Sequence, residues 1–450
     1  MCSKRASDQQ KPEEESSASA LKRFKRGQRA YHGRMRRQQH TAAQLEHEGA
    51  TREPVPTHPL ISATPPQLIT AQADLEEAVG HIRQAGRFAY DTEFIGELTY
   101  YPRLCVVQLA TTQRVMVVDP LTELDLRPVW QVIADPQVQT LVHAGQQDLE
   151  PVARNLGSPP ENVMDTQIAA GFIGLPYPLS LRELIRQLTG ANVNKGATFT
   201  EWDRRPLAPM QLEYAADDVR YLPAAWEAIQ RQLEARGHAD WARAECDKLC
   251  RMESYAYDLD AQVGRVKGGS ALSGRKLAVL RQLVQVRDQA ARQQDVPARS
   301  MMRDEVLVGL AKRQPTTAAE LHTFAGLPRP VEQAYGGELL EAVQKGQQGA
   351  PLERDEPRRP EPPAQRVAID SLWALIQSFC HSRGIDPALV ANRHEVRRLL
   401  DDASAPGRFE SGPLMQGWRG ELVGKFLTDF LKGRKGLLLR WHDGRLGSET

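Results

Sequence analysis

The feature that most constrains this chain is a short run in which acids alternate with aromatic and β-branched residues. The run at 88–94 (FAYDTEF) favours a β-strand, in which successive side chains point to opposite faces. Asp91 and Glu93 then share one face, and the aromatic residues and Thr92 share the other. Two neighbouring carboxylates on a rigid strand repel each other unless a cation lies between them. The run alone predicts either an ordinary polar strand face or half of a cation site.

Composition says more about the compartment than about the reaction. The 450 residues suffice for roughly two to four domains. The 58 basic and 57 acidic residues nearly cancel, so any contact with nucleic acid depends on local basic clusters. Five scattered cysteines are typical of a reducing cytosol, and no apolar run approaches the ~18 residues of a membrane span. With no signal-peptide core either, we expect a soluble, cytoplasmic protein that does not contact membranes.

The first 58 residues form a polar arm that we expect to be disordered, because they lack a sustained apolar period. Between Lys22 and Arg37 the arm has eight basic residues, no acid, and the aromatic residues Phe24 and Tyr31. Such a block is able to neutralise phosphates and stack on bases. A solvated tail explains it equally well. A short amphipathic helix or a targeting signal is a further alternative, although Glu13, Glu14 and Glu15 upstream argue against a transit peptide.

The region from about residue 65 has the pattern of an α/β sheet covered by helices. Short polar turns such as 111–114 favour antiparallel neighbours, whereas a connection through a helix allows parallel pairing. The expected elements are helices at 71–86 and 127–134, strands at 88–94, 104–110, 115–118 and 139–142, and further helices at 149–156, 165–172, 179–188 and 210–233.

Polar residues follow these elements at places where functional loops of α/β sheets collect. Asp148 comes just after a strand and at the start of a helix, so it is either a helix cap or a functional carboxylate. Asp165 is expected to be a cap, and His143 a packed or hydrogen-bonded residue at the strand end. Within the helix at 210–233, Tyr214 and Asp218 are four residues apart and therefore share one face.

Taken in order, Asp91-x-Glu93, Asp148 and Tyr214-x-x-x-Asp218 resemble the three motifs of the DEDD superfamily of 3′-5′ exonucleases. The histidine subclass has a His five residues before the last Asp, where this chain has Glu213, so the resemblance is to the tyrosine subclass. The wider context is similar to the ribonuclease D family over about residues 65–235. The matching segments are 91–94 (DTEF), 99–104 (TYYPRL), 142–145 (VHAG), 148–149 (DL), Trp202, 205–207 (RPL) and 214–219 (YAADDV).

This resemblance implies a ribonuclease H-like mixed sheet flanked by helices and a site for two Mg²⁺ or Mn²⁺ ions. It implies that Asp91 contacts both ions, that Glu93 and Asp218 hold the ion on the side of the attacking water, and that Asp148 holds the second. Tyr214 would orient that water, since its ordinary pKa of about 10 makes it a poor base. We also expect the following side chains to contact the substrate: Thr92, Phe94, His143, Lys195, Trp202 and Arg205.

The C-terminal half is expected to consist of helical modules. A helical bridge at 236–265 precedes a first module at 266–346, a proline-rich linker at 347–365, a second module at 366–442 and a tail at 443–450. Both modules resemble HRDC domains, which are small helical bundles that bind nucleic acid. The second is the better match, through 385–387 (IDP), 389–390, 417–419 (GWR) and Gly424. The first rests on its position, on 295–297 (DVP) and on 316–327. A helical scaffold or a dimerisation unit is the alternative.

The resulting hypothesis is an exoribonuclease that shortens RNA such as tRNA precursors from the 3′ end and releases 5′-mononucleotides, with no obligate protein partner. Between Arg265 and Arg313 there are 11 basic and 4 acidic residues, which would hold RNA phosphates without reading sequence. One alternative keeps the chemistry and makes DNA the substrate, because the sequence reveals no contact with a 2′-hydroxyl. Another is a non-catalytic RNA-binding protein, which the intact set of carboxylates and tyrosine argues against.

Overall fold

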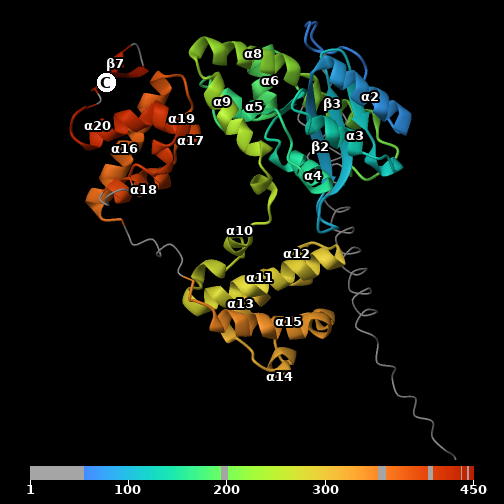
Figure 1. The fold of residues 1–450 in the computed structure, drawn as a ribbon, viewed down its shortest axis with the longest axis vertical. Helices are drawn as coiled ribbons and strands as arrows, with labels where there is room; N and C mark the ends of the chain where they lie inside the picture. Colours follow the sequence, from blue (N-terminus) through green and yellow to red (C-terminus); the bar gives the residue numbers. More distant parts are fainter. Residues whose placement is uncertain are drawn as a thin grey trace, which may run out of the picture. The chain divides into compact units, whose positions relative to one another are not determined.

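A computed structural model describes residues 55–193, 201–352, 361–403, 409–436, 438–442 and 445–449 (Figure 1). The arm before residue 55 and Lys195 lie outside these residues. The chain divides into two compact units. The smaller unit contains Ile95–Arg103 and Tyr257–Pro357, and the larger contains Glu46–Phe94, Leu104–Ala256 and Arg358–Thr450.

A six-stranded mixed sheet forms the centre of the larger unit, with the strand order β1-β4-β3-β2-β5-β6. β1 pairs in parallel with β4, β2 with β5, and β5 with β6, whereas β3 and β4 are antiparallel. The expected mixed sheet is therefore confirmed, with the acid-bearing β2 in its interior. The strands are β1 (Gln67–Ile69), β2 (Arg87–Ile95), β3 (Arg103–Ala110), β4 (Val115–Val118), β5 (Gln139–Val142) and β6 (Val163–Asp165).

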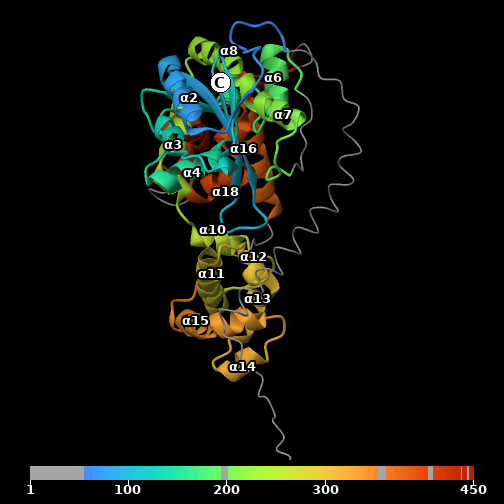
Figure 2. The same ribbon diagram turned by 90° about the vertical axis from the view of Figure 1, so that its right-hand side faces the viewer.

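Helices cover both faces of this sheet, as Figure 2 shows for α2 and α3 on one side and α6 and α7 on the other. β2 supplies alternate side chains to the two cores: Phe88 and Tyr90 pack with α2, α3 and α4, and Ala89 packs with α5 and α8. The helices here are α2 (Gln72–Ala85), η1 (Pro120–Thr122), α3 (Arg127–Ile133), α4 (Gln146–Leu156), α5 (Thr166–Gly171), α6 (Leu181–Thr189), α7 (Pro209–Arg220), α8 (Leu222–Arg236), α9 (Ala239–Cys246), η2 (Asp247–Cys250) and η3 (Met252–Tyr255).

The single helix expected at 210–233 is wrong, because the chain breaks there into α7 and α8. Tyr221 ends α7, and Pro223 lies in the first turn of α8. A proline in a helix interior lacks the N–H that the preceding turn needs and collides with its carbonyl, whereas the first turn tolerates it. The break lets α8 bury Ile229 in the core while α7 carries Tyr214 and Asp218 separately.

The second helical module belongs to the larger unit and shares its hydrophobic core. Trp418 is 6% exposed, its ring centroid lies 4.8 Å from that of Phe172, and its indole N–H donates to Glu245 at 2.8 Å. The Asp386 N–H donates to the carbonyl of Gly171 at 2.8 Å. This module therefore packs on the part of the unit that contains the sheet, and it consists of α16 (Pro363–Ser382), α17 (Pro387–Val390), α18 (Arg393–Ala403), η5 (Pro413–Met415), α19 (Gly417–Arg419), η6 (Gly420–Gly424) and α20 (Lys425–Leu431).

A β-hairpin follows these helices where only the end of a helical module and a tail were expected. β7 (Leu438–His442) pairs with β8 (Arg445–Glu449) in antiparallel register. The short β-rich run 438–442 (LLRWH) gave too little alternation to separate a strand from the end of a helix.

The smaller unit is helical and includes the segment Ile95–Arg103, which joins β2 to β3. The Tyr100 hydroxyl donates to Asp288 at 2.7 Å, and the Arg292 guanidinium lies 5.1 Å from the Tyr100 ring centroid. α11 and α15 approach so closely at Gly346 that a Cβ there would lie 2.4 Å from the Cα of Val279. The helices are α10 (Leu259–Gly264), η4 (Gly269–Ala271), α11 (Gly274–Gln294), α12 (Ala298–Met301), α13 (Asp304–Arg313), α14 (Ala318–His322) and α15 (Arg329–Gln348).

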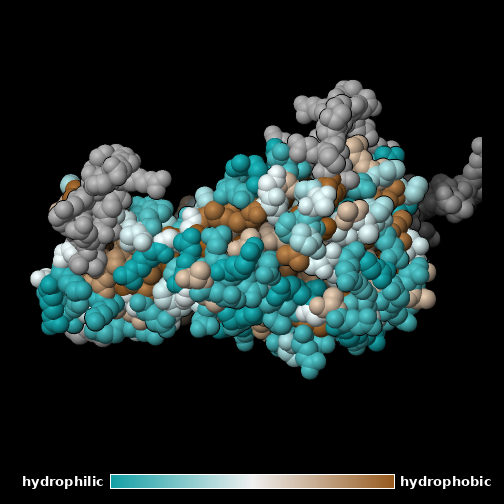
Figure 3. Space-filling view, turned by 90° about the horizontal axis from the view of Figure 1, so that it is seen from above, coloured by the Kyte–Doolittle hydropathy of each residue, from teal (hydrophilic) through white to brown (hydrophobic). Residues whose placement is uncertain are grey.

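Helices within the described ranges are all too short or too polar to span a bilayer. Hydrophilic residues predominate on the face drawn in Figure 3, with apolar residues in smaller patches between them.

The packing of Trp418 predicts that the second module unfolds together with the sheet. Trp418→Ala removes a buried aromatic ring and should cost roughly 3–5 kcal/mol of folding free energy. Trp418→Phe keeps a ring against Phe172 and should cost less. Denaturant unfolding combined with hydrogen exchange of α16 measures both effects, and unchanged protection of α16 in Trp418→Ala would contradict the shared core.

Candidate active site

The first two carboxylates lie side by side on β2. Asp91 and Glu93 are partly buried and follow Ala89 on the same face of the strand. Burial and the charges of Asp148, Asp218 and Glu93 raise the pKa of Asp91 well above its ordinary value. Burial and Asp148 raise the pKa of Glu93 from 4.5 to about 7. The acids therefore interact with carboxylates from other elements as well as with each other.

Asp148 is held in place by the opposite face of the same strand. The Thr92 hydroxyl donates to the Asp148 carboxylate, and the Tyr90 hydroxyl donates to the Asp148 backbone carbonyl at 2.8 Å. Gly145 is the N-cap residue of α4, so Asp148 lies inside the first turn and is not the cap. The alternative that explained Asp148 as an N-cap is therefore excluded.

The turn before α4 depends on Asp165 and on a glycine. Asp165 caps α5 by accepting from the Gln167 N–H at 2.8 Å, and it also accepts from the N–H groups of Ala144 at 3.0 Å and Gly145 at 3.2 Å. The expected cap is thus confirmed, with the added role of fixing the turn. A Cβ on Gly145 would lie 2.5 Å from the Cβ of Val142, so only glycine fits.

α7 supplies the remaining two groups from one face. Tyr214 donates a hydrogen bond from its hydroxyl to the Asp218 carboxylate. Burial and the charges of Asp218, Glu93 and Asp91 raise the pKa of Tyr214 far above its ordinary value. Burial and the charge of Glu93 raise the pKa of Asp218 as well. The structure therefore brings the predicted carboxylates and the tyrosine together.

The donor set fits divalent cations, since clustered carboxylate oxygens favour Mg²⁺ and Mn²⁺. In the described part of the chain, no three acidic, histidine or cysteine side chains already surround one metal position. Each of three carboxylates instead accepts from a neutral donor: Asp148 from Thr92, Glu93 from Trp202, and Asp218 from Tyr214. Cation binding would therefore require these carboxylates to exchange neutral hydrogen-bond donors for the cation.

Most of the residues expected to contact substrate bind other groups of the protein instead. Thr92 binds Asp148, and the His143 ring nitrogens lie 3.0 Å from the Thr166 hydroxyl and 2.9 Å from the Leu179 carbonyl oxygen. Both residues are thus engaged within the protein, and the expected hydrogen-bonded state of His143 is confirmed. Phe94 is partly exposed near the end of β2. Trp202 and Arg205 are also engaged within the protein, as described below.

The sequence did not reveal the residues that hold the catalytic side chains in position through hydrogen bonds. The pattern at 88–94 placed Tyr90 only on the face of the strand opposite the acids, and no motif includes Asp119, which binds Arg205. The only signal for Asp119 was its position directly after β4, at a strand end.

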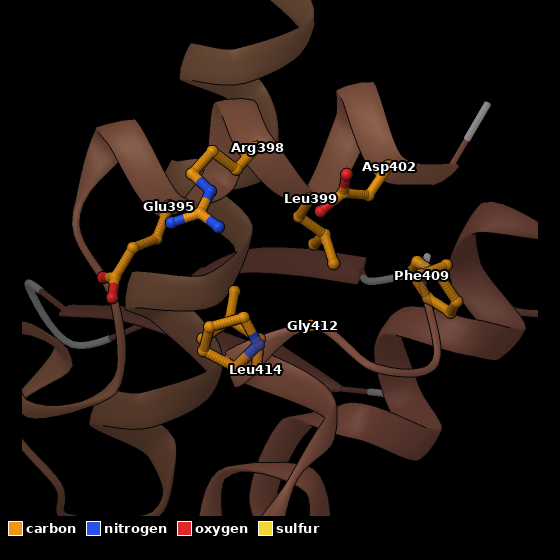
Figure 4. A pocket seen from close by; sticks show the side chains of 8 residues that line it. Glu395, Arg398, Leu399, Asp402, Phe409, Gly412 and Leu414 are labelled. Carbon is orange, nitrogen blue, oxygen red and sulfur yellow. The ribbon is translucent and has the colours of Figure 1, made fainter. Parts of the chain in front are cut away.

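The pocket drawn in Figure 4 belongs to the second helical module, where α18 faces the segment 409–414. It is lined by Arg398, Leu399 and Phe409 among others, and it contains none of the clustered carboxylates. The candidate active site is the group of carboxylates, because charge and hydrogen bonding converge there.

Comparison with known proteins decides the family. A family model described as a 3′-5′ exonuclease matches residues 66–234, and one for the HRDC domain matches residues 276–343. Ribonuclease D of Gluconacetobacter diazotrophicus is 32% identical over 82% of this chain and 93% of its own. That of Bartonella henselae is 30% identical over 83% of this chain and 92% of its own. The chain belongs to the ribonuclease D family. It is accordingly a hydrolase of the 3′-5′ exoribonuclease type, as the sequence predicted.

A solved structure supports the same fold. The crystal structure of Escherichia coli RNase D, described as an exoribonuclease involved in structured RNA processing, aligns with a TM-score of 0.67 and 29% identity. The alignment covers 82% of this chain and 99% of that one. The HRDC match falls on the first helical module, which the sequence had made the weaker of the two resemblances.

The crowded acids predict an unusual stability effect when divalent cations are withheld. Asp91→Asn removes a charge that repels its neighbours, so we expect thermal unfolding in EDTA at pH 8 to shift upward by about 2–4 °C. Asp74→Asn in the first turn of α2 is the control and should not stabilise the protein. A lower melting temperature for Asp91→Asn would contradict the clustering.

The direction of the pH dependence follows from Glu93. Its folded-state pKa of about 7 exceeds the ordinary value of 4.5, so the folded state binds more protons than the unfolded state between these values. This contribution to stability is complete below pH 4.5 and is lost as pH rises through about 7. Melting curves of wild type and Glu93→Gln in EDTA from pH 5 to 8 isolate it, because their difference should grow with pH in favour of the variant.

Proposed function

We propose that this protein uses two divalent cations, Mg²⁺ or Mn²⁺, to hydrolyse RNA from the 3′ end and release 5′-mononucleotides. The observation that supports this proposal is the convergence of four carboxylates from β2, α4 and α7, whose pKa values are raised by burial and, at Asp91, Glu93 and Asp218, by other members of the set. Neighbouring carboxylates disfavour one another's ionised forms, and bound cations favour those ionised forms.

Each carboxylate has its own role in cation binding. In this proposal Asp91 would serve both cations, Glu93 and Asp218 would hold the one on the side of the attacking water, and Asp148 would hold the other. Bound cations lower the pKa of water and stabilise charge on the phosphate oxygens. Thr92 and Tyr90 keep Asp148 directed toward β2.

Tyr214 acts as a neutral hydrogen-bonding group. A phenol has an ordinary pKa of about 10 and burial raises the pKa of Tyr214 further, so the group would stay protonated at physiological pH and is a poor general base. The hydroxyl proton is directed to Asp218, which leaves the oxygen lone pairs of Tyr214 available to accept a hydrogen bond from water. Tyr214 thereby orients a water molecule without taking its proton.

The activity test uses matched 3′-labelled and 5′-labelled RNA and DNA oligonucleotides with Mg²⁺, Mn²⁺ or EDTA. Lewis-acid stabilisation is worth several kcal/mol. At about 1.36 kcal/mol per tenfold in rate, Asp91→Asn and Asp218→Asn should lower kcat by at least about 10³-fold. Tyr214→Phe, which removes only the hydroxyl, should lower kcat by about 10²-fold. Mononucleotide release that survives EDTA or Asp91→Asn would refute the mechanism.

We further propose tRNA precursors, processed in the cytoplasm, as the substrates. E. coli RNase D is described as acting in structured RNA processing, and the HRDC module here carries the basic excess between Arg265 and Arg313. DNA is the competing substrate, and the paired RNA and DNA oligonucleotides above separate the two possibilities.

The role of the first module predicts a salt-dependent binding defect. Lys276 on α11 and Lys312 on α13 are exposed, and the double variant Lys276→Gln/Lys312→Gln should weaken binding to a tRNA-like RNA. The slope of log affinity against log salt should fall by about 0.7–0.9 for each lost phosphate contact. Arg83→Gln on α2 is the control. An unchanged slope in the double variant would contradict RNA binding through these lysines.

A further inference from the structure

Trp202 reaches the active site from a segment that belongs to neither the sheet nor a helix. It is only 4% exposed, and its indole N–H donates to the carboxylate of Glu93. Its ring centroid lies 5.9 Å from that of Tyr214, with the ring planes 33° apart. A single buried side chain thus contacts one catalytic group from β2 and another from α7.

Arg205 fixes the backbone of Trp202 to the sheet. Its guanidinium donates to both carboxylate oxygens of Asp119, at 2.5 and 2.6 Å, and to the carbonyl of Cys105 at 2.8 Å. A third donor of the same group binds the carbonyl of Trp202 at 2.6 Å. Asp119 is 2% exposed and follows β4, and Cys105 lies in β3. The bidentate pair therefore anchors Trp202 to two adjacent strands.

We propose that Trp202 is a positioning residue that sets the orientation of the Glu93 carboxylate and the Tyr214 ring, and that Arg205 influences the site only through Trp202. This inference rests on the proposed function, in which Glu93 holds a cation and Tyr214 orients water. Burial excludes Trp202 from stacking on a base. It also leaves Trp202 unable to act as the substrate contact expected from the sequence.

The physical argument compares the donors that hold the carboxylates. Thr92 and Tyr214 belong to the same strand and helix as other catalytic groups, so regular backbone structure fixes them. The donor to Glu93 comes from an irregular segment, and its position depends on the Arg205 contacts. A glutamate has three side-chain torsions, so without the indole N–H its carboxylate rotates more freely and must be ordered when a cation binds.

The test measures cation binding directly as well as catalysis. Trp202→Phe keeps an aromatic ring beside Tyr214 and removes the donor to Glu93. Its affinity for Mn²⁺, from calorimetric titration of the full chain without RNA, should fall by about 10–100-fold. The KM for a short 3′-labelled RNA, at saturating Mn²⁺, should stay unchanged. Unchanged Mn²⁺ affinity would overturn the proposal whatever happens to kcat.

Neighbouring arginines provide a matched pair of variants. Arg205→Lys keeps the charge but loses the bidentate geometry, and it should reduce Mn²⁺ affinity in the same direction as Trp202→Phe. Arg204→Lys is the control, because the Arg204 side chain is 72% exposed and pairs with Glu201 at 2.8 Å. Arg204→Lys should leave Mn²⁺ affinity unchanged.

A double variant tests whether Arg205 acts through Trp202. If it does, Trp202→Phe/Arg205→Lys should bind Mn²⁺ no more weakly than the weaker single variant. Additive losses would overturn that part of the proposal. Failure of the proposed function is distinguishable: a wild-type protein that binds Mn²⁺ but releases no mononucleotide refutes the activity, while the Mn²⁺ affinities of the variants still decide the role of Trp202.

Discussion

Repulsion among four carboxylates is the constraint on which the larger unit depends. Burial raises the pKa of Asp91, Glu93, Asp148 and Asp218, and neighbouring carboxylates add to the rise, with Asp165 as the contributor at Asp148. Such a cluster is stable only where the surrounding fold holds it together. β2 is the source of both the repulsion and the restraint. One of its faces carries two of the acids, and the other face holds Asp148 through Tyr90 and Thr92.

The neutral donors around the site explain how the cluster tolerates this repulsion. Threonine, tyrosine and tryptophan donate hydrogen bonds without adding positive charge, so they restrain carboxylates and leave the net negative field for cations. An arginine in their place would neutralise the field and compete with the metal. Arg205, which holds the backbone of Trp202, is paired with Asp119 and otherwise donates to backbone carbonyls.

Local patterns in the sequence predicted the parts of the site that regular structure positions. The two-residue period placed Asp91 and Glu93 together, and the four-residue spacing placed Tyr214 with Asp218. The break at Tyr221 was missed because apolar spacing continued through Pro223. β1 and β6 were missed because three residues are too few for a periodicity. Trp202 and Asp119 act through contacts between distant segments, which no local pattern records.

The segment Ile95–Arg103 has a consequence for how this chain is divided. It leaves β2 two residues after Glu93, yet its Tyr100 binds Asp288 and contacts Arg292 of α11. The smaller unit is therefore discontinuous in sequence, and Ile95–Arg103 is synthesised long before Tyr257–Pro357. A fragment that ends at residue 256 would retain the segment Ile95–Arg103 without α11, which Tyr100 contacts. The nuclease part and the first module are thus distinct compact units that a single cut in the gene does not divide.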